Sequence, residues 1–91
     1  MNLTSQNFTS ETSSGESLVL FCSSTFPKKK YILDKLSSFP RVFFVDIEEQ
    51  RDLEEKFNIR ISPIVYHFKD GEIINTYTMN QLDNLICIIK S

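Results

Sequence analysis

Two cysteines, one histidine and a run of three lysines are the side chains of this chain that could do chemistry. Cys22 and Cys87 lie far apart, and with only His67 beside them they are too few for a four-ligand zinc site. Either thiol could form a mixed disulfide with a partner. The run Lys28-Lys29-Lys30 could bind an acidic peptide, a phosphate or a nucleic-acid backbone, although a solvated surface has the same composition.

Other kinds of site have few residues to support them. A phosphate-binding loop needs several glycines, whereas this chain has two, and Gly71 is expected to occupy a tight turn. His67 stands between Tyr66 and Phe68 in an apolar stretch, which favours a packed core histidine over a catalytic one. No Ser-His-Asp triad or carboxylate pair can be argued. We therefore predict no cofactor and no metal.

Length and composition predict one soluble domain over residues 1–91, because so short a chain holds a single hydrophobic core. The hydrophobic fraction of 41% and the charged fraction of 24% are ordinary for folded proteins. A net charge of −2 gives no overall attraction to nucleic acid or to anionic membranes. No apolar run could span a bilayer, and residues 1–17 lack the features of a signal peptide, so we predict a cytoplasmic protein.

Apolar runs predict the strands that must position the candidate residues. Residues 1–16 are rich in Ser and Thr and are expected to form a loosely ordered lead-in. Leu18–Cys22 is an unbroken apolar run, typical of a central strand covered on both faces, and Val42–Val45 is a second one. Residues 64–68 and 73–78 flank a glycine-bearing turn and predict an antiparallel hairpin.

Three helices are expected between and after these strands. The first should begin at an N-cap of Ser24 or Thr25 and end before Pro40, which places it between two strands and suits parallel pairing. Residues 48–58 predict a short amphipathic helix. The last helix should be capped by Asn80, although a strand remains an alternative in this apolar region.

The resulting order, β-α-β-α-β-β-α, predicts an α/β domain with a central mixed sheet and flanking helices. Few small folds use this order, and the chain is similar to the thioredoxin family over nearly its whole length. The stretches that carry the resemblance are Leu3-Thr4, Asn7-Phe8, Leu18–Phe21, Val45–Ile47, Glu55–Pro63 and Phe68–Glu72. The chain departs from the family at Tyr77–Asn80, which is shorter than the family's glycine-containing loop before the last helix.

The resemblance implies that Pro63 is the family's cis-proline, whose neighbouring backbone holds an extended peptide. It also implies that the two cysteines of the family's Cys-x-x-Cys motif fall on Phe26 and Lys29, and that the family's buried acid falls on Leu20. Neither the dithiol nor its proton acceptor is present. The resemblance therefore implies a thioredoxin-like protein that has lost dithiol exchange.

The leading hypothesis is a redox-inactive module that binds a protein or peptide partner through the cis-proline groove. Its predicted binding residues are Phe26, Pro27, Lys28, Lys29, Ser62, Pro63 and Ile64. In this hypothesis Phe26 is an exposed apolar anchor, and the lysines select acidic side chains of the partner.

Two alternatives stay open. The first is an atypical single-thiol redox protein or sensor that uses Cys22 or Cys87 with an external reductant such as glutathione. The second and weaker one is an assembly subunit, because the apolar band Leu85–Ile89 is broader than one buried helix stripe requires and could support a homodimer.

Overall fold

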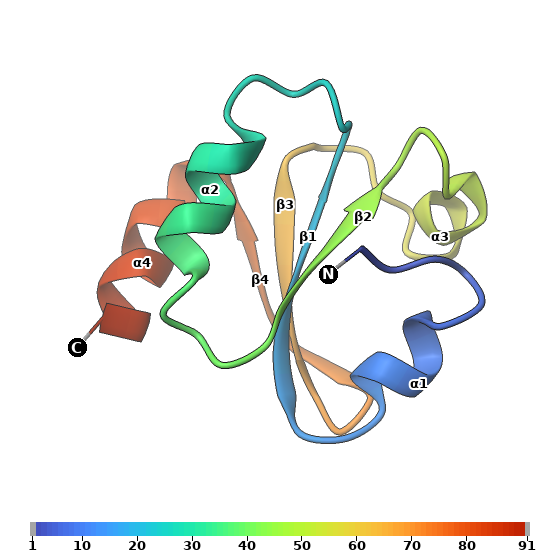
Figure 1. The fold of residues 1–91 in the computed structure, drawn as a ribbon, viewed down its shortest axis with the longest axis horizontal. Coiled ribbons are helices and arrows are strands. Elements are labelled where there is room, and N and C mark those ends of the chain that lie inside the picture. The colour runs from blue at the N-terminus through green and yellow to red at the C-terminus, as the bar shows by residue number, and fades with distance from the viewer. Residues whose placement is uncertain (1, 91) are drawn as a thin grey trace.

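The computed structural model describes residues 2–90 of the chain, without the side chains of residues 89 and 90 (Figure 1). Its elements, in chain order, are α1 (Phe8–Thr12), β1 (Glu16–Cys22), α2 (Lys29–Leu36), β2 (Val42–Asp46), α3 (Arg51–Lys56), β3 (Ile64–Lys69), β4 (Glu72–Thr78), the 3-10 turn η1 (Met79–Gln81) and α4 (Leu82–Lys90). The last element is a helix, so the alternative of a strand in this region is wrong.

The four strands form one mixed sheet in the order β2-β1-β3-β4. β1 pairs in parallel with β2 and antiparallel with β3, and β4 pairs antiparallel with β3. Every residue from Ser17 to Cys22 is at most 1% exposed, as its apolar composition predicts for a strand inside the sheet. The predicted central mixed sheet with flanking helices is confirmed.

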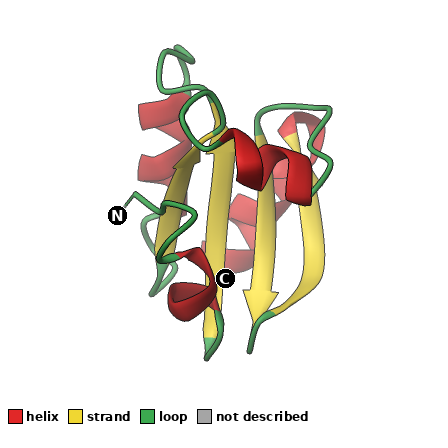
Figure 2. Cartoon of the chain, turned by 90° about the vertical axis from the view of Figure 1, so that its right-hand side faces the viewer, coloured by secondary structure: helices red, strands yellow, loops and turns green. Residues whose placement is uncertain are grey.

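Helices cover both faces of the sheet, which gives three layers. One core joins Val19 and Phe21 of β1 to Phe8 of α1 and Leu53 of α3. The other face of β1 packs against α2 and α4, through side chains that include Ile32, Leu36, Leu82 and Leu85. Figure 1 shows α2 and α4 on one side of the strands and α1 and α3 on the other. In Figure 2, seen from the side of α1 and α3, the strands run side by side.

The β3–β4 hairpin turns through Asp70 and Gly71, whose φ angles are +51° and +87°. A two-residue turn of this kind needs positive φ at both positions, which Asp and Gly tolerate. The Asp70 carboxylate also accepts a hydrogen bond of 2.8 Å from the backbone N–H of Gly15. This bond fixes the hairpin to the start of β1.

The prediction of a loosely ordered lead-in over residues 1–16 is wrong for most of the segment that the structure describes. Leu3 and Phe8 are only 2% and 3% exposed, and the Leu3 N–H donates a 2.8 Å hydrogen bond to the carbonyl of Phe44. Two large apolar side chains are enough to fasten a short segment when the rest of the core supplies the surface they cover. Composition alone does not show that surface.

Two of the predicted helix caps are also wrong. α2 begins at Lys29, and its N-cap residue Lys28 makes no side-chain cap bond. The last helical region is capped by Thr78 and Gln81, which form a reciprocal capping box, and not by Asn80. The middle helix α3 is shorter than the predicted range of 48–58, because residues 46–50 form a turn in which the Gln50 N–H donates to the Asp46 carbonyl at 2.8 Å.

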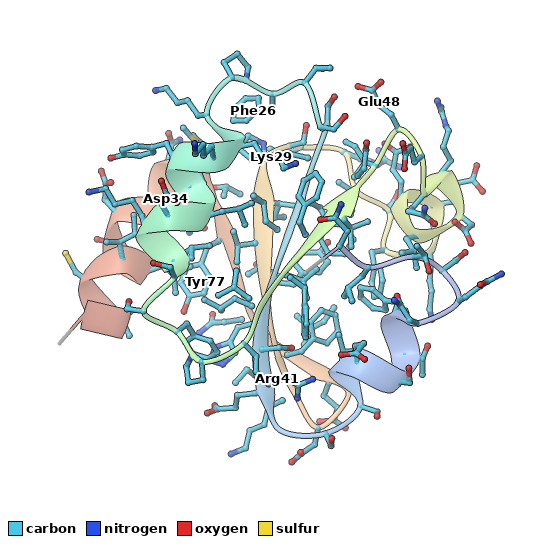
Figure 3. The ribbon with its side chains drawn as sticks, in the orientation of Figure 1. Phe26, Lys29, Asp34, Arg41, Glu48 and Tyr77 are labelled. Atoms are coloured by element: carbon cyan, nitrogen blue, oxygen red, sulfur yellow. The ribbon has the colours of Figure 1, made fainter. Side chains whose placement is uncertain are left out.

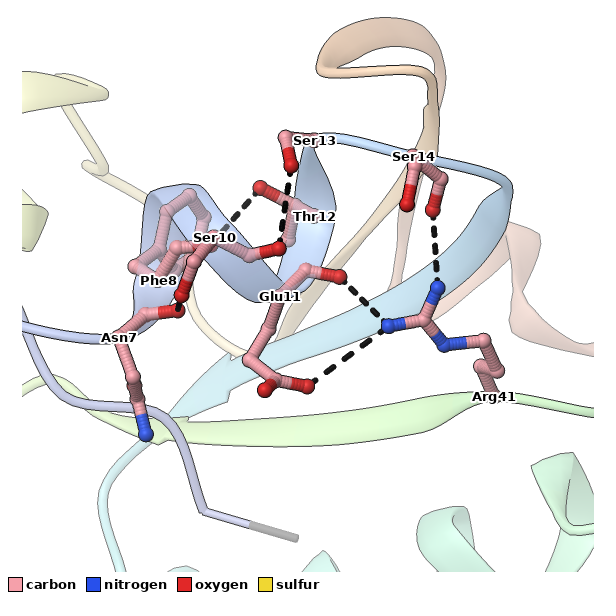
Figure 4. A network of polar contacts seen from close by, with 8 residues as sticks. All are labelled: Asn7, Phe8, Ser10, Glu11, Thr12, Ser13, Ser14 and Arg41. Carbon is pink, nitrogen blue, oxygen red and sulfur yellow. Dashed lines mark hydrogen bonds and ion pairs between the residues drawn. The ribbon is translucent and has the colours of Figure 1, made fainter.

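Arg41 ties the N-terminal segment to the start of β2 (Figure 4). Its guanidinium donates to the backbone carbonyls of Ser14 at 2.8 Å and Glu11 at 2.7 Å, and lies 3.7 Å from the Glu11 carboxylate. It also lies 5.3 Å from the ring centroid of Phe43. A planar fork with several N–H donors can satisfy two carbonyls at once, which an ammonium group does less well.

We expect Arg41→Lys to lower the free energy of unfolding by about 1–2 kcal/mol, because a partly exposed charged donor loses part of its bonding to two carbonyls. Chemical denaturation of the variant and of wild type measures this difference. Arg51→Lys is the matched control, since Arg51 is exposed and should lose almost nothing. Equal losses in the two variants would contradict a tethering role for Arg41.

Candidate functional site

Sheet register brings the predicted site residues to one end of the molecule. Phe21 of β1 lies opposite Ile64 of the antiparallel strand β3, so Cys22, which follows Phe21, and Pro63, which precedes Ile64, belong to the same end of the sheet. The loop of residues 23–28 leaves β1 at this end and leads into α2. Figure 3 shows Phe26, Lys29 and Glu48 at this end and Arg41 at the opposite one.

The loop after β1 is held by side-chain and backbone hydrogen bonds. The Ser23 hydroxyl accepts a 3.2 Å bond from the Thr25 N–H and is hydrogen-bonded to the Glu48 carboxylate. The Phe26 N–H donates to the Ser23 carbonyl at 3.0 Å, and the Lys29 N–H donates to the Phe26 carbonyl at 3.1 Å. Ser24 and Thr25, the predicted N-cap residues, lie within these turns. The helix α2 therefore starts only at Lys29.

Phe26 lies at the tip of this loop, and its side chain is half-buried and packs against the core between the sheet, α2 and α4. The sequence-based expectation of an exposed anchor therefore needs correction. Part of the ring supports the fold, and only the remainder is available to a partner. Pro27, the next residue, is exposed.

The lysines at the start of α2 differ from one another. Lys28 and Lys30 are exposed, whereas Lys29 is half-buried with its ammonium 4.0 Å from the ring centroid of Phe44. This cation–π contact holds Lys29 over the sheet. Lys28 is thus the member of the predicted binding set whose charge is most open to a partner.

Cys22 is the cysteine at this end, and it is 1% exposed. Burial raises the pKa of its thiol to about 11, while the nearby Lys29 charge lowers this pKa and the Asp46 carboxylate raises it. A buried thiol with a raised pKa is a poor nucleophile because it is the thiolate that attacks. The geometry does not favour single-thiol chemistry at Cys22.

The segment before β3 completes this end of the molecule. The peptide bond between Ser62 and Pro63 is cis. Ser62 is exposed and Pro63 is buried, while Ile64 is half-buried and packs against the core on the α1 and α3 side. Ser62 is therefore an exposed residue next to two side chains that are buried or half-buried.

Sequence reasoning missed two features of this end. Ile61, directly before Ser62, is 60% exposed, which is unusual for a large aliphatic side chain. Glu48, which bonds to Ser23, adds a carboxylate on the far side of the loop. The exposure of Ile61 had a local signal, because this residue follows an arginine in a segment without a strand or helix pattern. The contact between Ser23 and Glu48 had none, because it joins residues far apart in the chain.

The remaining candidates lie elsewhere. His67 is half-buried in β3, with its ring edge-on to Phe39 and its Nε2 3.5 Å from the Glu16 carboxylate. Cys87 is exposed on α4, near Ile88, which is 60% exposed. The predicted apolar band Leu85–Ile89 is described only in part, because the side chain of Ile89 lies outside the described residues. Neither cysteine is in a disulfide.

Comparison with solved structures decides what this architecture is. Thioredoxin f2 of Chlamydomonas reinhardtii superposes with a TM-score of 0.82 at 20% identity, over 99% of this chain and 93% of that one. A thioredoxin of Malassezia sympodialis gives 0.79 at 23% identity, over 98% and 88%. The chain has the thioredoxin fold. A designed protein is similar as well, with a TM-score of 0.85 at 20% identity, over 98% and 87% of the two chains.

The similarity is one of structure. No protein-family model matches the chain, and no curated protein resembles it significantly in sequence. Of the two residues that the resemblance assigns to the family's cysteine positions, Phe26 lies in the loop before α2 and Lys29 is the first residue of α2. Within residues 2–90, no helix is long and apolar enough to cross a membrane.

Proposed function

We propose that this chain is a redox-inactive thioredoxin-fold domain that binds an extended stretch of a protein partner at the end formed by the β1–α2 loop and Ser62-Pro63. One observation carries the proposal: the single cysteine at this end, Cys22, is buried and has a raised pKa, whereas Ser62 and Lys28 beside it are exposed. Such a surface suits binding better than thiol exchange.

In the proposed mode, the partner runs alongside Ser62-Pro63 and pairs with the backbone of Ser62, as an added strand does, because Ile64 is already paired with Phe21 and Thr78. The exposed part of Phe26, with Ile61, offers apolar contact, and Pro27 borders it. Lys28 attracts acidic side chains of the partner, while Lys29 stays over the Phe44 ring and contributes through its charge alone. The cytoplasmic location inferred from composition stays part of the proposal.

The test selects peptides from a displayed random library with the wild-type domain and maps the selected sequences by NMR. We expect enrichment in Asp and Glu beside apolar residues, with amide shifts centred on Ser62 and on its neighbours Ile61 and Ile64, since Pro63 has no amide proton. Lys28→Glu should weaken binding of a selected acidic peptide about fivefold to tenfold at low salt, with a smaller effect at high salt, because screening shortens electrostatic reach.

Lys69→Glu is the matched control, because Lys69 is exposed at the opposite end of β3 and should change affinity little. A selected peptide that shifts amides elsewhere, or that is indifferent to Lys28→Glu, would contradict the proposed site. An assay of disulfide reduction with wild type should give only the buffer rate. Activity that disappears in Cys22→Ser would instead support the single-thiol alternative.

A further inference from the structure

A pocket of about 350 Å³ lies on the α1 and α3 side of the sheet, next to the β3–β4 hairpin and away from the loop after β1. Its lining comes from α1, the end of α3 and the hairpin. The turn of the hairpin lies at the end of the sheet where β1 begins, because Glu16 of β1 lies opposite Lys69 of β3. The proposed peptide site is at the other end of the sheet, where β1 ends. The pocket is therefore separate from that site.

The base of the pocket is aromatic. Phe8, Phe57 and Phe68 all line it, and their ring centroids lie 5.2 to 6.1 Å from one another. Phe8 and Phe68 are almost fully buried, while Phe57 is half-buried and Ile73 on the hairpin side is 42% exposed. A small apolar group placed here would cover Phe57 and Ile73 and remove their surface from water.

The rim carries one charge of each sign. Lys56 and Glu72 both line the pocket from different elements, and both side chains are exposed. The Lys56 ammonium lies 5.6 Å from the Phe57 ring centroid, so the cation stands directly beside the aromatic base. A ligand with a single negative or a single positive charge would meet one attractive and one repulsive group.

We propose that this pocket binds a small zwitterion with an apolar body, of the chemical class of an apolar amino acid. Its carboxylate would meet Lys56, its ammonium group would meet Glu72, and its apolar body would cover Phe57 and Ile73. The volume is near the lower end of the range for ligand sites, which limits the ligand to a small molecule. A pocket whose two charged side chains are exposed to solvent predicts affinity in the millimolar range.

The test is an NMR titration of the isotope-labelled full chain with L-phenylalanine as probe. We expect saturable amide shifts at Phe57 and at Gly71 to Ile73. Two analogues separate the charges: 3-phenylpropionate lacks the ammonium group and 2-phenylethylamine lacks the carboxylate, and each should bind roughly twofold to fivefold more weakly. Glycine, which lacks the apolar body, should produce no saturable shift.

Two exposed substitutions assign each charge. Lys56→Gln should weaken L-phenylalanine by the same roughly twofold to fivefold and leave 2-phenylethylamine no weaker, and Glu72→Gln should spare 3-phenylpropionate in the same way. Lys30→Gln, on α2, is the matched control and should change nothing. Absence of saturable shifts, shifts centred outside the pocket, or equal binding of the zwitterionic and the singly charged probes would overturn the proposal. The outcome of this titration does not depend on whether a peptide binds near Lys28, because the pocket and the proposed peptide site lie at different ends of the sheet.

Discussion

Cys22 in the native protein should react with a thiol reagent at least about a hundredfold more slowly than in the unfolded chain at neutral pH. Its pKa of about 11, against an ordinary value of 9.0, lowers the thiolate fraction by about that factor, and an exposure of 1% slows access further. Mass spectrometry after timed alkylation, with and without denaturant, measures both rates. The Cys87→Ser variant isolates the signal of Cys22.

Exposed Cys87 provides an internal reference in the wild-type chain, and it should be alkylated first. Since burial is the largest cause of the raised pKa of Cys22, the labelling rate in the folded protein should keep rising with pH beyond 9, toward about 11. Labelling of native Cys22 as fast as that of Cys87 would contradict the buried position, and it would favour the single-thiol alternative for the function of this domain.

Phe21→Ala should destabilise the fold by about 3–5 kcal/mol, a large part of the stability of a small domain. Phe21 is fully buried in β1, and its ring centroid lies 5.1 Å from that of Tyr66, 5.8 Å from that of Phe57 and 6.0 Å from that of Phe8. Removing the ring leaves a cavity among three other aromatic side chains. Denaturant unfolding followed by circular dichroism measures the loss.

Phe26→Ala is the matched comparison, because the same ring is removed from a half-buried position. We expect a loss of about 1–2 kcal/mol there, between the values for a core and a surface side chain. If Phe21→Ala is too unstable to measure, Phe21→Leu keeps an apolar side chain and should give a smaller, measurable loss. A Phe26→Ala loss as large as that at Phe21 would mean that Phe26 is purely structural and would argue against its part in partner binding.

Much of the fold follows from the sequence, because unbroken apolar runs demand cover on both faces. The side chains of Leu18–Cys22 are shielded from water on both faces when this strand lies inside a sheet with helices on either side. The helix in the connection to Val42 favoured parallel pairing of the two strands. The hairpin turn followed from Asp70 and Gly71, whose local preferences agree with positive φ. These features depend on residue type and spacing along a short stretch of chain.

The sequence by itself also determined that the chain has two cysteines, Cys22 and Cys87, which are too far apart along the chain to form a Cys-x-x-Cys motif. The sequence did not determine which side chains outside the strands are buried in the folded chain. Composition suggested a loose N-terminal segment, yet Leu3 and Phe8 are buried by surfaces that only the folded sheet and α3 supply.

Tertiary structure alone decided the character of the two candidate surfaces. Phe26 is half-buried because α2 and α4 pack beside the loop, and Lys29 is held by the ring of Phe44 in β2. The pocket arises where α1, α3 and the hairpin meet, which joins Phe8 to Lys56 and Glu72. Periodicity shows which side chains favour burial, but the partners of each side chain depend on strand register and helix packing between residues far apart in the chain.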